Sequence, residues 1–187
     1  MFANPEVGDE GKTEMIGYID IREQVDADFS HAVRRAFLHR IGARLRGNSA
    51  STRAPSFEEA AKVLGARNRI RLGRKVVAVE KIVGSVGRAN DFDRAFLPAR
   101  RSLEGGWKRV DSAFHLGLDL PPVVLYKLGE SYFVLDGNHR ISVARYQGVQ
   151  WIEAEVTQFY APTAQSVPAV VDGADSKPEQ MPQPAAA

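Results

Sequence analysis

The sequence contains no cysteine, and this absence removes several kinds of chemistry at once. Without thiols the chain cannot form a disulfide, supply a thiolate nucleophile or build a cysteine-based zinc site. Long apolar runs are also missing, because none approaches the ~18 residues of a membrane-spanning helix. The acidic N-terminal residues do not resemble a secretory signal. We therefore expect a cytoplasmic protein with no membrane partner.

Histidine is scarce, with four residues among 187. His31 and His39 stand eight residues apart, and neither has a carboxylate at its i+4 position, so a zinc site built on them is not expected. We expect no metal site made of protein side chains. The metal that we consider is Mg²⁺, as the companion of a bound nucleotide.

What the chain does have is an uneven distribution of charge. Residues 1–30 carry eight acidic and two basic side chains, whereas residues 31–75 carry twelve basic and two acidic ones. A basic block of this size favours a polyanion partner such as DNA. It could equally pair with the acidic N-terminal residues.

Composition and apolar periodicity divide the chain into four segments. A single domain is expected at this length. The segments are a flexible lead-in at 1–19, a basic helical extension at 20–75, a folded domain at 76–159, and a disordered Pro/Ala-rich tail at 160–187.

The extension contains an amphipathic pattern in which Phe29, Val33, Phe37 and Ile41 recur every four residues. We favour a helix that docks on the domain with its arginines in water, since a charge run on a helix is usually a solvated face. The alternative is a helix that binds nucleic acid or a membrane surface. Its candidate contacts are Arg34, Arg35, Arg40, Arg44 and Arg46.

The 76–159 segment alternates strand-like and helix-like patterns. A β-branched run at 76–79 is followed by a Gly-Ser-Val-Gly-Arg loop at 84–88, and a helix is expected within 102–117. A hairpin is expected from 123–126 and 132–135, then a helix at 141–146 and a last strand at 152–156. This order predicts an α/β (α+β) domain with a small mixed sheet, a hairpin and packed helices.

The most informative motif is Asp136-Gly137-Asn138-His139-Arg140, at the junction of the hairpin and the following helix. The first amides of a helix lack intrahelical partners and carry the positive end of its dipole, which suits a phosphate. Arg140 has the forked donors that phosphate oxygens favour. We expect Asp136 to cap the helix rather than to hold Mg²⁺. A plain turn is the alternative.

The motif and the order of elements around it resemble the ParB/sulfiredoxin superfamily over residues 76–159. The resemblance implies that Gly137, Asn138, His139 and Arg140 contact the phosphates of CTP or ATP. It also implies that Gly87 and Arg88 approach the nucleotide from the other side of the pocket.

The departures from that superfamily restrict the function. Asn138 occupies the place of the cysteine that sulfiredoxin needs, so this chain is not a sulfiredoxin. No helix-turn-helix domain follows the last expected strand, and a complete centromere-binding clamp is therefore not expected. The motif is also similar to the Asp-Gly-His-His-Arg-like motif of small-molecule kinases in the superfamily. Asp136 and His139 are then the catalytic candidates.

Three functional hypotheses follow. In the first, the domain binds a nucleotide at the motif and hydrolyses it or transfers its phosphoryl group. In the second, the protein is a ParB-like DNA-associated regulator or partition accessory that binds DNA through the basic N-terminal segment. In the third, the N-terminal helices dock on the domain or form a homodimer, and the motif has no ligand.

Overall fold

The computed structural model describes residues 10–47 and 52–162. Two single-turn 3-10 helices, Val79–Lys81 and Arg101–Leu103, accompany the regular elements. In chain order these are α1 (Glu10–Leu45), α2 (Phe57–Val63), β1 (Asn68–Ala78), β2 (Ile82–Ser85), α3 (Glu104–His115), β3 (Val123–Leu128), β4 (Ser131–Asp136), α4 (Asn138–Tyr146) and β5 (Trp151–Tyr160).

The strands form one mixed sheet in the order β1-β5-β3-β4-β2. β3 and β4 make the expected antiparallel hairpin, which turns at Gly129, and β1 pairs antiparallel with β5. The contacts of β3 with β5 and of β2 with β4 are parallel. The predicted α+β class, with its hairpin, packed helices and N-terminal helical extension, is confirmed.

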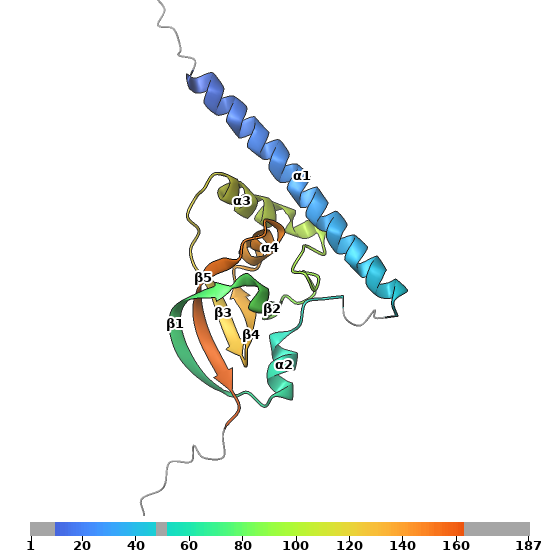
Figure 1. Ribbon diagram of the computed structural model, residues 1–187, viewed down its shortest axis with the longest axis vertical. Coiled ribbons are helices and arrows are strands. Elements are labelled where there is room, and N and C mark those ends of the chain that lie inside the picture. The colour runs from blue at the N-terminus through green and yellow to red at the C-terminus, as the bar shows by residue number, and fades with distance from the viewer. Residues whose placement is uncertain (1–9, 48–51, 163–187) are drawn as a thin grey trace, which may run out of the picture.

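The helices α3 and α4 lie together at one end of the sheet, and α1 runs across them as a long rod (Figure 1). The short helix α2 packs through Phe57 against Leu128 and Phe133, near the other end of the strands. Ser56 caps α2, because its hydroxyl accepts a hydrogen bond from the Glu59 amide.

The face of α1 that docks on the domain matches the predicted stripe in its first half, at Phe29 and Val33, and departs from it afterwards. Phe29, Ala32 and Ala36 are buried there, whereas the side chains of Phe37 and Ile41 are 51% and 39% exposed. The two alanines let the helix backbone come close to the domain, and larger residues at those positions would hold it away. The predicted stripe is therefore wrong beyond its first turns.

Two predicted boundaries also differ from the structure. Residues 10–19, expected as part of the flexible lead-in, are helical, and residues 1–9 lie outside the described part of the chain. The sheet begins at Asn68 rather than at residue 76, because the arginine-rich stretch 68–75 pairs with residues 154–160 of β5. The tail from residue 163 onward also lies outside the described residues.

The sequence predicts no membrane-spanning helix, and the described helices can be compared with that expectation. Among residues 10–47 and 52–162, no helix combines the length and the apolar character that crossing a bilayer requires.

Candidate functional site

The turn between β4 and α4 has the backbone geometry that an anion site requires. Gly137 is left-handed, with φ 96° and ψ 25°, and a Cβ atom there would lie 2.7 Å from Cγ1 of Val123. Glycine is therefore the residue that fits. The first helical amide with a partner is that of Ile141, which donates to the Gly137 carbonyl at 3.0 Å. The three amides before it, at residues 138–140, have no acceptor among the described residues.

Asn138 anchors this turn to the neighbouring strand. Its side chain is buried, and its Oδ1 accepts a hydrogen bond of 2.7 Å from the Ser85 hydroxyl. Ser85 belongs to β2, an edge strand where the sequence suggested a ligand loop. The amide side chain of Asn138 is thus used inside the protein, which leaves its backbone N–H as the group that a ligand could reach.

The ring of His139 packs into a space left by Gly106 of α3, where a Cβ atom would lie 2.7 Å from Nε2. Its Nδ1 is buried and has no hydrogen-bond partner among the described residues. Burial lowers the pKa of His139 below its usual 6.5, and the positive charges of Arg88 and Arg109 lower it further, against a smaller opposite effect of Asp91. The structure therefore favours a neutral imidazole.

The guanidinium of Arg140 is engaged within the chain. It donates hydrogen bonds to the carbonyl oxygens of Pro121 and Pro122, the latter at 3.0 Å, and to Oδ2 of Asp136 at 2.7 Å. These bonds tie the segment before β3 to the first turn of α4. Gly137 is the N-cap and no side chain caps the helix, so the expected capping role of Asp136 is wrong.

Gly87 and Arg88 are also occupied by carboxylates of the chain itself. The Gly87 amide donates to Oε1 of Glu58 at 3.0 Å, and Nε of Arg88 donates to Oδ2 of Asp91 at 2.8 Å. Burial alone would raise the pKa of Glu58, but hydrogen bonds from the Ser56 hydroxyl and from the Glu58 and Gly87 amides lower it. This loop thus holds an anionic group already.

The residues named from the sequence do not line one common cavity. Arg140 lines a hollow of about 790 Å³ together with Phe114, Pro122 and Trp151, and the lining of that hollow includes neither Gly87, Arg88 nor His139. Arg88 is near enough to His139 to lower the pKa of its ring. The site therefore divides into the start of α4 with His139, and a separate cluster around the Arg140 guanidinium.

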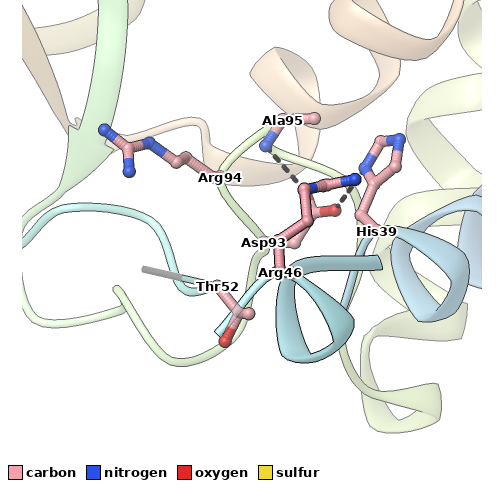
Figure 2. A pocket seen from close by; sticks show the side chains of 7 residues that line it. His39, Arg46, Thr52, Asp93, Arg94 and Ala95 are labelled. Atoms are coloured by element: carbon pink, nitrogen blue, oxygen red, sulfur yellow. Dashed lines mark hydrogen bonds and ion pairs between the residues drawn. The ribbon is translucent and has the colours of Figure 1, made fainter. Parts of the chain in front are cut away.

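A second polar contact joins α1 to the loop before α3 (Figure 2). Oδ2 of the buried Asp93 lies 3.0 Å from Nδ1 of His39, and its Oδ1 accepts the Ala95 and Leu97 amides at 2.9 and 2.8 Å. Asp93 therefore fixes a turn and holds α1 in place. The pair borders a cavity of about 390 Å³ at the end of α1.

The basic residues of α1 have different surroundings. Arg40 is used structurally, since its guanidinium donates to the Ala99 carbonyl at 3.3 Å. The remaining four candidates are exposed and form no ion pair with any residue in the described ranges: Arg34, Arg35, Arg44 and Arg46. Arg35 also lies over the Tyr146 ring, 6.0 Å from its centre.

Comparison with known proteins gives one result. No protein-family model matches the chain, and no curated protein matches it. Among solved structures, sulfiredoxin from Arabidopsis thaliana aligns with a TM-score of 0.31 and 18% identity, over 48% of this chain and 84% of that one. A similarity at this level concerns the fold alone. Membership of the ParB/sulfiredoxin superfamily, and each binding role assigned from it, stays a prediction.

Proposed function

We propose that this protein binds the phosphate groups of a nucleotide at the first turn of α4. The observation that supports this is the set of three unpartnered amides at residues 138–140, presented directly after the left-handed Gly137. Such amides, at the positive end of a helix dipole, are a general binding site for anionic oxygens. CTP or ATP, with Mg²⁺ as its companion ion, is the ligand class that we propose.

His139 gives the site a titratable donor. Its Nδ1 has no partner among the described residues, and the charges of Arg88 and Arg109 make its surroundings positive. An anion bound nearby would offset these charges and favour the protonated ring. Of the two catalytic candidates, His139 is therefore the one whose titratable group has no partner among the described residues, because Asp136 is paired with Arg140.

Arg140 and Asn138 have positioning roles in this proposal. Their side chains fix the segment before β3 and the edge strand β2 against the turn. Their amides would contact the phosphate. Substituting Arg140 would disturb the turn itself, so binding is better tested at His139 and Arg88.

Calorimetric titration with CTP, ATP and GTP, each with Mg²⁺, tests the proposal. We expect one nucleotide per chain, and His139→Gln and Arg88→Gln each to weaken binding about five- to tenfold, the loss of one charge-assisted hydrogen bond. Arg71→Gln is the matched control, because it removes an exposed arginine from β1. Absence of heat with all three nucleotides, or equal weakening by Arg71→Gln, would contradict the proposal.

The pKa of His139 provides an independent readout. Because the folded-state pKa is lowered, the neutral ring stabilises the fold fully above pH 6.5, and this contribution is lost as the pH falls below that value. Bound phosphate should raise the pKa of His139. An NMR titration of the ring with and without inorganic pyrophosphate measures this, and an unchanged pKa at saturating ligand would exclude His139 from the site.

A second candidate is the binding of DNA through α1. The observation that favours it is the exposure of Arg34, Arg35, Arg44 and Arg46 without acidic partners among the described residues. Free arginines on one helix are suited to phosphate backbones.

A further inference from the structure

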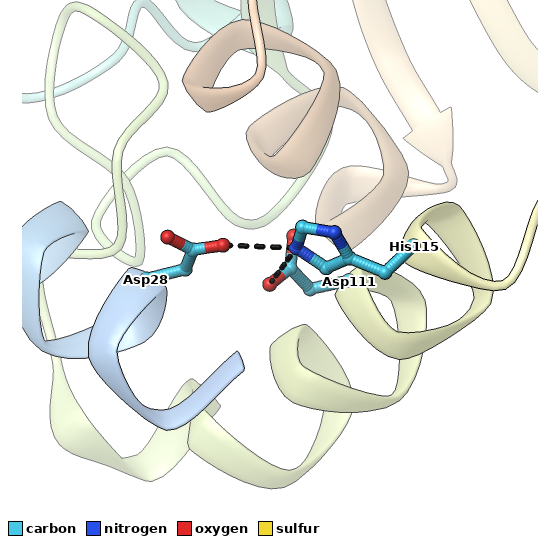
Figure 3. A group of neighbouring side chains, drawn as sticks. All are labelled: Asp28, Asp111 and His115. Atoms are coloured by element: carbon cyan, nitrogen blue, oxygen red, sulfur yellow. Dashed lines mark hydrogen bonds and ion pairs between the residues drawn. The ribbon is translucent and has the colours of Figure 1, made fainter. Parts of the chain in front are cut away.

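Two carboxylates and one imidazole meet where α1 docks on α3. Asp28 comes from α1, whereas Asp111 and His115 lie one turn apart on α3 (Figure 3). Asp28 is 6% exposed and Asp111 is fully buried. Two buried acids beside each other are costly unless a proton or another cation is shared between them.

The three side chains converge on one small volume. Oδ2 of Asp28 lies 2.9 Å from Nε2 of His115, and Oδ2 of Asp111 lies 3.6 Å from the same nitrogen. The three ligand atoms all lie within 4.8 Å of one another. A tetrahedral ion with bonds of ~2.0–2.1 Å sets its ligand atoms ~3.3 Å apart, and the two distances from Nε2 of His115, 2.9 and 3.6 Å, lie on either side of that value.

A surrounding set of donors fixes the other oxygen of each carboxylate. Oδ1 of Asp28 accepts hydrogen bonds of 3.0 Å from Gln24 and from the Tyr146 hydroxyl. Gln147 donates to Oδ1 of Asp111 at 2.9 Å and also to Oδ2 of Asp28 at 3.3 Å. Outer donors of this kind orient the ligands of metal centres. They leave both Oδ2 atoms turned toward the imidazole.

Hydrogen bonding within the cluster leaves one atom unsatisfied. Nε2 of His115 can donate a single proton, and its 2.9 Å contact with Asp28 uses that proton. Oδ2 of Asp111 is buried and has no hydrogen-bond partner within residues 10–47 and 52–162. A cation can be shared by all three ligands, whereas a proton on the imidazole cannot.

We propose that Asp28, Asp111 and His115 form a Zn²⁺ site. The imidazole favours Zn²⁺ over Mg²⁺ and Ca²⁺, which prefer ligand sets made of oxygen. Asp28 and His115 also line a cavity of about 580 Å³, which provides an entry path. The site uses no residue of the β4–α4 turn, and it goes beyond the proposed nucleotide binding.

The test is equilibrium dialysis of the metal-free full chain against Zn²⁺ alone, with Mg²⁺ and Ca²⁺ in parallel. We expect one tightly bound Zn²⁺ per chain and much weaker binding of the other two ions. Asp111→Asn and His115→Gln should each lower the affinity for Zn²⁺ at least about tenfold. His39→Gln is the matched control, because it removes the imidazole of the other His–Asp pair between α1 and the body.

Retention of full Zn²⁺ affinity by both variants would overturn the proposal, and so would equal loss in His39→Gln. Circular dichroism checks folding. If Asp111→Asn does not fold, the Zn²⁺ affinity of His115→Gln is the test. We expect this variant to fold, because the ring of His115 is partly exposed. X-ray absorption of the wild-type complex should show nitrogen and oxygen ligands at ~2.0–2.2 Å. A six-coordinate, water-rich shell would also contradict the site.

Discussion

At the scale of single residues, three glycines near α4 allow close packing that a residue with a side chain would prevent. Gly84, Gly106 and Gly137 leave room for a backbone carbonyl, for the ring of His139 and for a valine methyl group. Each position lies where two elements come closer than a Cβ atom would allow. The loss of stability caused by a Cβ atom at such a position can be measured on the protein without any ligand.

Gly84→Ala should destabilise the fold. Its Cβ atom would lie 2.2 Å from the Pro55 carbonyl oxygen and 2.8 Å from the Phe133 ring, so backbone must move. We expect the free energy of unfolding to fall by about 2–3 kcal/mol, as for other overpacked sites. Urea denaturation measures the change.

Gly105→Ala is the control for this substitution, since a Cβ atom there meets nothing within 4 Å. In helix α3 an alanine should be neutral or stabilise by up to about 1 kcal/mol. Equal midpoints of denaturation for the two variants would show that the close contact at Gly84 does not make an added methyl group destabilising.

At the scale of elements, the first turn of α4 is held by Arg140, which joins it to the segment before β3. Arg140→Ala should cost about 1.5–3 kcal/mol, because two proline carbonyls lose a charged donor. Asp136→Asn removes the ion pair between Asp136 and Arg140 but keeps the hydrogen bonds of Arg140 to the proline carbonyls, so it measures the ion pair alone. Asp136 is 72% exposed, so its loss should cost less than about 1 kcal/mol. Thermal unfolding of both variants tests this order, and a larger loss for Asp136→Asn would refute it.

The elements that the sequence predicted are those with local signals. The β3–β4 hairpin follows from two apolar runs, 123–126 and 132–135, around a short turn that contains Gly129. The strand β2 was missed because its stability comes from pairing with β4, which lies far along the chain. Pairing at that distance leaves no local pattern in a stretch of four residues.

The candidate sites divide in the same way. The backbone of the β4–α4 turn could be predicted, because the glycine and the strand-to-helix junction are visible in the sequence. The engagement of Arg140 with proline carbonyls could not. For the Asp28, Asp111 and His115 cluster, the i,i+4 spacing on α3 was the available signal, and the third ligand comes from a helix far away in the sequence.

At the scale of the whole molecule, the basic part of the chain includes α1, which docks on the domain and carries four exposed arginines. If four of them contact DNA phosphates, the logarithm of the binding constant should fall with the logarithm of salt concentration with a slope of about −3.6. The double variant Arg44→Gln/Arg46→Gln should reduce the steepness by about 1.8. Fluorescence anisotropy with a duplex measures it.

The control for this measurement is Arg71→Gln/Arg74→Gln, which removes two arginines from β1 that are paired with Glu155 and Glu153. Its salt slope should match that of the wild type. A salt response that is flat in the wild type, or equal slopes for both double variants, would end the case for α1 as a DNA-binding element.

The way α1 docks also defines what folds together. Phe29, Ala32 and Ala36 of α1 form one apolar cluster with Trp107 of α3 and Val143 of α4. A fragment that began at the first strand would expose the indole of Trp107 to water and lose one wall of this cluster. The N-terminal helix thus supplies one wall of this apolar cluster, and we expect it to unfold together with the elements that it covers.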